Sequence, residues 1–310
     1  MRKIVTALAL LGVLVLPSWG QTKRPKVVAT FLPMYLFTKG VVGDRAEVEV
    51  LVPPGTSAHE YQATPANART LSQANVVVMN GLGLEEFMSG LLKNVGNGNL
   101  RLIDASKGIQ AIGASAGAAD RAGKKEHKHG HHHDHGHRHS HSEGNPHVWL
   151  DPVLAMQQVN NIRDGLVAAD PPNAQIYRTN AATFIKQLQD LDQEFRTRLA
   201  PVRGCKFIAF HDAFPYLARR YGLQQMAVVE LPEDALKPQD IQRVKTAAQK
   251  FQVKAILSEP GVDDKRLQQI AQELQLPVKT LDPLERGELQ PEYYFKVMRQ
   301  NLATLEAVCK

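Results

Sequence analysis

The sequence predicts an α/β protein in which two lobes, each built on a parallel sheet, are joined by one long rigid helix. Short runs rich in Val and Ile alternate with longer helical stretches, and the runs fall into two groups of four. They are nearly continuous in apolar residues, which is typical of parallel strands that are covered on both faces. The predicted strands are 26–30, 48–52, 76–80 and 100–104 in the first lobe, and 206–210, 226–230, 255–258 and 278–281 in the second.

Segments with helical periodicity lie between these strands, such as 65–73, 236–251 and 265–274. Regular alternation of strands and helices is the pattern of α/β lobes with parallel sheets.

The joining helix is predicted from a segment, 170–200, that contains no glycine and separates the two groups of strands. Asp170 is suited to cap a helix, and Pro171 fits its first position. An apolar stripe at spacings of four, three, four and four follows, formed by Phe184, Leu188, Leu191, Phe195 and Leu199. About 29 residues at a rise of 1.5 Å each give a rod of roughly 44 Å. We expect a rigid strut, because a flexible linker would be rich in Gly and Ser.

The composition is that of an ordinary globular protein, with 310 residues, 43% hydrophobic side chains and a formal net charge of +6. These values exclude wholesale disorder and a small disulfide scaffold. The modest basic excess comes without a basic stripe interleaved with aromatic residues, so we expect no binding to nucleic acid.

Residues 1–20 have the order of a secretory signal peptide. A short basic start precedes an apolar run from 4 to 16, and small residues just before Gln21 fit a cleavage site. An apolar core of about 13 residues is too short to span a bilayer, which takes roughly 20. We therefore expect a protein that is secreted to the periplasm. The mature chain then divides into an N-terminal lobe (21–169), the joining helix (170–200) and a C-terminal lobe (201–310).

One segment of the N-terminal lobe, 113–143, begins with small residues and continues as a run dominated by histidine. Nothing in it can build a core, so we expect a disordered surface loop. Nine of the twelve histidines of the chain lie in this His-rich loop: His127, His129, His131, His132, His133, His135, His137, His139 and His141.

The other three histidines are far apart in the sequence, but their positions relative to the predicted strands are informative. His59 lies a few residues after the second strand, and His211 and Asp282 directly follow the fifth and the last. Ligands of open parallel sheets bind beyond the carboxyl ends of the strands, so groups from both lobes could converge on one cleft. Together with His147 they offer three imidazoles and a carboxylate, a donor set that suits tetrahedral Zn²⁺. The sequence thus predicts a metal site between the lobes.

Several acidic residues near these positions are expected to have other roles. Asp151, which precedes a proline, is expected to cap a helix rather than to bind metal. Glu60 is expected at the surface. Glu230 and Glu259 end predicted strands, and we expect them to orient a ligand rather than to bind the metal.

Cys205 and Cys309 are the only cysteines, and an oxidising compartment favours a disulfide between them. The pair would close a long loop and stabilise the fold by about 2–4 kcal/mol. The alternative is two buried free thiols.

Four stretches resemble the metal-binding receptors of bacterial ABC importers for zinc and manganese. They are PPGTSAHEYQATPANARTLSQANVVVMNGLGLEEFM, NPHVWLDP, FHDAFPYLARRYGL and the closing LDPL. The resemblance covers essentially the whole mature chain, and the His-rich loop just before NPHVWLDP is similar to that of the zinc-specific branch.

This resemblance implies a fold of two (βα)₄-type lobes joined by one long helix, with the metal in the cleft between them. It implies that His59, His147 and His211 bind the metal, and that Asp282 occupies the position of the fourth ligand in many relatives. In zinc receptors of this group, water or another carboxylate often takes that place instead. Manganese-type relatives carry a glutamate in place of His211, which favours zinc here. The resemblance also implies delivery of the metal to an ABC-type membrane permease, and we expect a monomer.

The predicted function is high-affinity binding of zinc, held as a transported substrate, without enzymatic activity. The His-rich loop would collect zinc with low affinity or sense it, although it could also be a mere spacer. One alternative is a receptor for manganese or another divalent metal. A zinc hydrolase is a second alternative, but the sequence has no HExxH motif, nucleophile elbow or phosphate loop.

Overall fold

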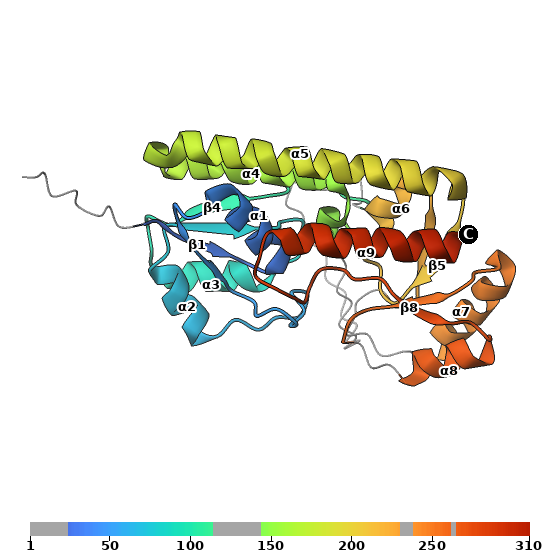
Figure 1. Ribbon diagram of the computed structural model, residues 1–310. Helices are drawn as coiled ribbons and strands as arrows, with labels where there is room; N and C mark the ends of the chain where they lie inside the picture. Colours follow the sequence, from blue (N-terminus) through green and yellow to red (C-terminus); the bar gives the residue numbers. More distant parts are fainter. Residues whose placement is uncertain (1–23, 114–143, 230–237, 262–264) are drawn as a thin grey trace, which may run out of the picture.

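The computed structural model of the chain describes residues 24–113, 144–229, 238–261 and 265–310 (Figure 1). The predicted signal peptide, the nine histidines of the His-rich loop and Glu230 lie outside the described residues.

Two parallel sheets form the centres of the two lobes, as predicted, and each has four strands. The strand order is β2-β1-β3-β4 in the first sheet and β6-β5-β7-β8 in the second, so both lobes have the same topology. The strands are β1 (Lys26–Ala29), β2 (Glu47–Val50), β3 (Val76–Met79), β4 (Arg101–Asp104), β5 (Lys206–Ala209), β6 (Gln224–Ala227), β7 (Ile256–Ser258) and β8 (Val278–Thr280).

Two of the edge strands, β2 and β6, begin and end earlier than the sequence predicts. Leu51 and Val52 lie beyond the end of β2, and Val228 and Val229 lie beyond the end of β6, yet all four are buried. Their backbone N–H groups still donate to carbonyl oxygens of the adjacent strand or of the residue that follows it. One example is the bond from Leu51 to the carbonyl of Ala29 at 2.8 Å. An apolar run in the sequence therefore includes the buried residues that follow an edge strand as well as the strand itself.

The helices cover the sheets, and proline stands in the first turn of α1, α2, α4 and α6, where its missing N–H costs no hydrogen bond. None of the helices in the described part of the chain is both long and apolar enough to cross a membrane. They are α1 (Leu32–Val42), α2 (Pro65–Ser72), α3 (Phe87–Val95), α4 (Pro152–Ala169), α5 (Ala174–Leu199), α6 (Pro215–Tyr221), α7 (Pro238–Phe251), α8 (Lys265–Glu273) and α9 (Glu292–Cys309).

The long helix α5 joins the lobes, and short 3₁₀ turns flank it at Pro171–Asn173 and Ala200–Val202. All five residues of the predicted apolar stripe are buried. Asp170, however, does not cap the helix. Its carboxylate accepts hydrogen bonds from Asn173 Nδ2 at 2.7 Å and from the Tyr177 hydroxyl at 2.6 Å. The tight turn that the two prolines impose moves the start of the α-helix beyond the reach of a cap at Asp170.

The C-terminal helix α9 is a second connection between the lobes, which the sequence did not predict. Figure 1 shows it running parallel to the rods of α4 and α5 along both lobes. Its Tyr294 packs against Phe37 of α1 with ring centroids 5.0 Å apart, and its Phe295 packs against Phe184 of α5 at 4.9 Å. One hydrophobic core therefore runs from the first lobe into the second.

A disulfide joins Cys205 and Cys309, as predicted. Cys205 precedes β5 and Cys309 ends α9, so the bond anchors the C-terminal helix to the C-terminal lobe. It lies at the amino end of β5, whereas His211 follows the carboxyl end of that strand.

Candidate metal centre

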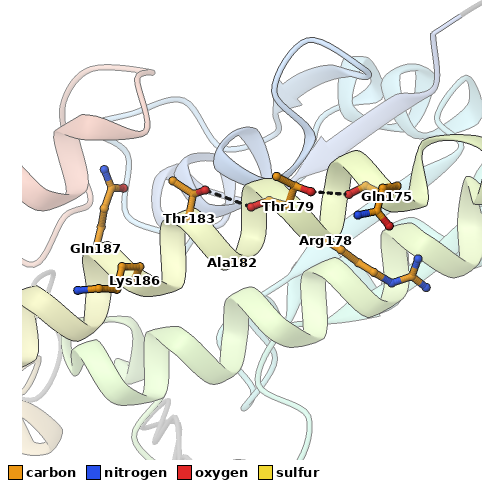
Figure 2. Close-up of a pocket in the computed structure, with 7 residues that line it drawn as sticks. All are labelled: Gln175, Arg178, Thr179, Ala182, Thr183, Lys186 and Gln187. Atoms are coloured by element: carbon orange, nitrogen blue, oxygen red, sulfur yellow. Dashed lines mark hydrogen bonds between the residues drawn. The ribbon is translucent and has the colours of Figure 1, made fainter.

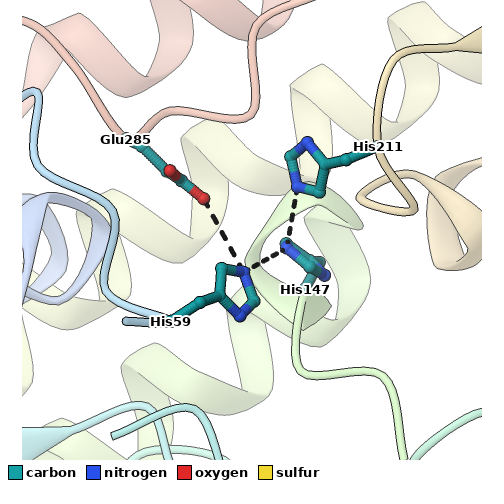
Figure 3. Close-up of side chains that lie close together, drawn as sticks. All are labelled: His59, His147, His211 and Glu285. Atoms are coloured by element: carbon teal, nitrogen blue, oxygen red, sulfur yellow. Dashed lines mark hydrogen bonds and ion pairs between the residues drawn. The ribbon is translucent and has the colours of Figure 1, made fainter. Parts of the chain in front are cut away.

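His59, His147 and His211 come together between the lobes, although 88 and 64 residues separate them along the chain (Figure 3). His59 lies in the loop after β2, and His211 directly follows the exit of β5. His147 immediately precedes the 3₁₀ turn Val148–Leu150 that leads into α4. The carboxyl ends of strands from both sheets thus supply the site, as expected for open parallel sheets.

The fourth member of the group is Glu285, in the segment after β8. Its Oε1 lies 4.0 Å from Nε2 of His59. The Nε2 atom of His147 lies 3.1 Å from that of His59 and 3.2 Å from that of His211. One donor atom from each of the four residues lies within 4.8 Å of every other.

These separations are close to those of donors around one zinc ion. A tetrahedron with metal–ligand distances of about 2.0–2.1 Å has edges of about 3.3–3.4 Å. The side chain of His59 is 2% exposed and that of Glu285 is 13% exposed, while His147 and His211 are buried. Because little water reaches these donors, a bound cation would interact with them strongly.

Two of the imidazoles are oriented through their second nitrogen. Nδ1 of His147 lies 3.0 Å from Oδ1 of Asn145, and Nδ1 of His211 is hydrogen bonded to the carboxylate of Glu259. Glu259 also accepts a bond from the backbone N–H of His211 at 3.2 Å. Since a carbonyl and a carboxylate oxygen can only accept, each Nδ1 carries the proton and each Nε2 lone pair faces the centre of the group. The expectation that Glu259 orients a ligand fits these contacts.

Asp282, the sequence candidate for the fourth ligand, is not part of the four-residue group. Its backbone exchanges two hydrogen bonds with the side chain of Asn301, each 2.8 Å long. Its carboxylate accepts a 2.7 Å bond from the backbone N–H of Leu284. Of the two carboxylates, Glu285 and not Asp282 therefore lies in the group with the three histidines. Burial raises the pKa of Asp282 to about 6.

The sequence did not predict Glu285 because three acidic residues, Asp282, Glu285 and Glu288, follow β8. Only the backbone conformation determines which of them faces the histidines. Leu284 has φ = +66° although it is not glycine, and it is fully buried. A left-handed leucine is costly and persists only where its surroundings enforce it. The turn that presents Glu285 is therefore a constrained feature of the fold.

Asp151 and Glu60 lie where the sequence predicted them. Asp151 caps α4, accepting from the backbone N–H of Val153 at 2.9 Å, and it pairs with Arg220 of the other lobe. Burial raises the pKa of Asp151 despite that guanidinium. Glu60 is exposed, next to His59.

A separate hollow lies on the outer face of α5, and Figure 2 shows the residues that line it, from Gln175 to Gln187. The Thr179 and Thr183 hydroxyls donate to carbonyls of their own helix, at 3.0 and 3.2 Å. None of the lining residues belongs to the histidine group.

Comparison with known proteins places this geometry in a family. A family profile described as "ZnuA: Zinc-uptake complex component A periplasmic" matches residues 27–308. The chain is 35% identical to the high-affinity zinc uptake system protein ZnuA of Bacillus subtilis, over 90% of this chain and 86% of that protein. It is 30% identical to the zinc-binding protein AdcA of Streptococcus pyogenes over 98% of its own length, but spans only 61% of that relative.

A solved structure supports the same assignment. The fold matches the crystal structure of the Zn(II)-bound ZnuA-like domain of Streptococcus pneumoniae AdcA with a TM-score of 0.75 and 28% identity, covering 93% of this chain and 99% of that one. The family match covers nearly the whole described chain, both sheets included. The chain therefore belongs to the ZnuA family of extracytoplasmic zinc-binding solute-binding proteins, which are transport receptors of zinc uptake systems and not enzymes.

Proposed function

We propose that this protein binds one zinc ion at His59, His147, His211 and Glu285 and passes it to an ABC-type membrane permease. The observation that carries the proposal is the convergence of the three Nε2 atoms, with 3.1 and 3.2 Å between neighbours, beside the Glu285 carboxylate. The Nε2 lone pairs of His147 and His211 face each other and repel, and a bound cation would convert this repulsion into attraction.

The donor set favours zinc over manganese. Imidazole nitrogen is a good ligand for zinc, whereas manganese sites more often use oxygen donors. With four protein donors a tetrahedral zinc ion has no open position for a reactive water, which favours transport over hydrolysis.

Competitive titration of zinc against manganese tests this assignment. The mature chain without residues 124–143 is compared with the same chain carrying His211→Ala, and Glu60→Ala serves as the matched control because Glu60 is an exposed neighbour of His59. We expect one tight zinc site that His211→Ala weakens by more than about 100-fold and Glu60→Ala leaves unchanged. Manganese binding equal to that of zinc, or zinc binding indifferent to His211→Ala, would overturn the assignment.

Residues 1–20 are proposed to direct the chain to the periplasm and to be cleaved before Gln21. Sequencing the N-terminus of the protein recovered from the periplasm tests this step. A mature protein that still begins with Met1 would contradict it.

The His-rich loop is proposed to collect zinc for the site, with lower affinity than the preorganised group because its ligands must first be ordered. The backbone N–H of Asn145 donates to the carbonyl of Ile112 at 2.8 Å, so the described residues that flank the loop lie together. Removing residues 124–143 should leave the tight site intact, lower the number of weakly bound zinc ions and slow growth under zinc limitation. If neither stoichiometry nor growth changes, the loop is a spacer.

A further inference from the structure

The side chain of Asn145 lies between a proposed zinc ligand of one lobe and an acidic residue of the other. Its Nδ2 donates to the Asp212 backbone carbonyl at 2.6 Å and to the Asp212 carboxylate at 3.1 Å. Its Oδ1 accepts from the backbone N–H of His147 at 3.1 Å and faces Nδ1 of the same residue at 3.0 Å. One amide therefore contacts both lobes and the imidazole.

The partners determine which way this amide points. Both Asp212 atoms are acceptors, so the NH₂ group must face them and the carbonyl oxygen must face His147. That carbonyl in turn favours a proton on Nδ1 of His147, which places the lone pair on Nε2, the atom that faces the other two histidines. The tautomer of an N-terminal lobe ligand thus depends on a residue of the C-terminal lobe.

Asp212 is itself held in place. Its second carboxylate oxygen accepts from Nε2 of Gln225 in β6 at 2.7 Å. Asp212 also directly follows His211, so any displacement of that stretch moves a ligand and the partner of Asn145 together.

Two more residues of the C-terminal lobe contact the segment around His147, one through its backbone and one through a side chain. The Tyr216 hydroxyl donates to the carbonyl of Asn145 at 2.5 Å, and Arg220 pairs with Asp151. Asp212, Tyr216 and Arg220 are spaced four residues apart. Of these three contacts, only that of Asp212 acts on the Asn145 side chain, which holds the imidazole.

We propose that Asn145 is a positioning residue, and that the contact Asp212–Asn145–His147 couples zinc affinity to the relative position of the two lobes. The inference rests on the zinc site proposed above. When the lobes part at this contact, the amide loses the partners that fix its orientation, and His147 loses its preferred tautomer as His211 moves away with Asp212. Separation of the lobes would then weaken zinc binding in two ways at once, through the tautomer of His147 and through the displacement of His211.

A double-mutant cycle with Asn145→Ala and Asp212→Ala tests the coupling, with zinc affinity measured by chelator competition. Loss of a group that orients a metal ligand typically weakens binding by about 10–100-fold, and we expect Asn145→Ala to fall in this range. Asp212→Ala should weaken binding less in the parent, and should have no further effect once Asn145 is alanine. Additive effects in the cycle would overturn the proposed coupling.

The matched control is Asn161→Ala, which removes another partly buried amide with two backbone acceptors, Ala105 at 2.7 Å and Lys107 at 3.0 Å. It should lower the thermal midpoint as much as Asn145→Ala does but leave zinc affinity unchanged. Equal zinc affinities of the Asn145→Ala and Asn161→Ala variants would contradict the positioning role.

A measurement on the full chain without substitutions keeps the inference testable if a variant does not fold. Long-range ¹H–¹⁵N spectra of the zinc-free protein should show the proton of His147 on Nδ1, and a proton on Nε2 would overturn the inference. A different result would refute the proposed zinc site itself, namely a His211→Ala variant that binds zinc as tightly as the parent. A strong effect of His211→Ala with none of Asn145→Ala would refute only the role of Asn145.

Discussion

The backbone N–H of Gly55 donates a 2.9 Å hydrogen bond to the carbonyl oxygen of Glu285. Gly55 belongs to the loop that carries His59, so this bond ties an N-terminal ligand loop directly to the turn that carries the fourth donor. Gly55 has φ = +96°, a conformation that other residues rarely adopt, and a Cβ there would come within 3.2 Å of Arg286 Nη1. A backbone hydrogen bond thus holds the two loops together.

The first prediction separates the two carboxylates that follow β8. Glu285→Gln should weaken zinc binding at least about tenfold, since even residues that only orient a ligand typically cost 10–100-fold. Asp282→Asn is the matched control. It keeps an oxygen for the Leu284 N–H and should change the affinity much less. Chelator competition measures both, and a larger loss in Asp282→Asn would assign the fourth ligand to Asp282 after all.

The second prediction concerns proton competition. An imidazole must be neutral to bind metal, and its ordinary pKa is about 6.5. Zinc affinity should therefore fall steeply as the pH is lowered from about 7.5 to about 5, because three imidazoles take up protons in place of the metal. Equilibrium dialysis at a series of pH values checks this. Zinc occupancy that stays constant down to about pH 5 would argue against a site with three histidines.

The third prediction concerns Glu85, a buried carboxyl just before the start of α3. Burial raises its pKa from 4.5 to about 7, although the Thr30 hydroxyl and the N–H groups of Asn80 and Gly81 donate to it and offset part of the effect. Between these two pH values the folded state binds more protons than the unfolded state. The free energy of unfolding contributed by this group is present below pH 4.5 and is lost as the pH rises towards 7.

Glu85→Gln keeps one acceptor oxygen but cannot ionise, so its stability should depend less on pH. Denaturant unfolding of chelator-treated protein across this pH range gives the difference between parent and variant, in which contributions from the histidines cancel. The free energy of unfolding of the parent should fall relative to that of the variant as the pH rises. An identical pH dependence in both proteins would show that Glu85 does not titrate in this range.

The fourth prediction concerns the disulfide. Replacing both Cys205 and Cys309 by serine should cost about 2–4 kcal/mol of stability, because the bond closes a long loop. Zinc affinity should not change, since the bond lies at the amino end of β5 and the ligands lie beyond its carboxyl end. Urea unfolding and zinc titration of the same variant measure the two effects. A loss of zinc affinity in the same variant would contradict this prediction, because it would show that the position of α9 affects the metal site.

The sequence predicted both sheets and the long helix because their signals are local. Each strand is a run of apolar residues, and the stripe from Phe184 to Leu199 follows the helical period. The expectation that His59 and His211 meet followed from one general property, the place of ligands at the carboxyl ends of parallel strands.

The parts that were missed depend on contacts between segments far apart in the chain. The position of Glu285, rather than Asp282, beside the three histidines depends on Asn301 of α9 and on the left-handed backbone of Leu284. The second connection between the lobes rests on Tyr294 meeting Phe37 and Phe295 meeting Phe184. No periodicity in the sequence encodes such pairs. The signal peptide and the His-rich loop lie outside the described residues and stay predictions.

The most direct test of the central claim is a crystal structure of the zinc-loaded protein with anomalous diffraction recorded on both sides of the zinc absorption edge. We predict one strong anomalous peak at bonding distance, about 2.0–2.2 Å, from Nε2 of His59, His147 and His211 and from the carboxylate of Glu285. A peak that lacks one of these histidines, or one bound by Asp282 with Glu285 turned away, would contradict the account.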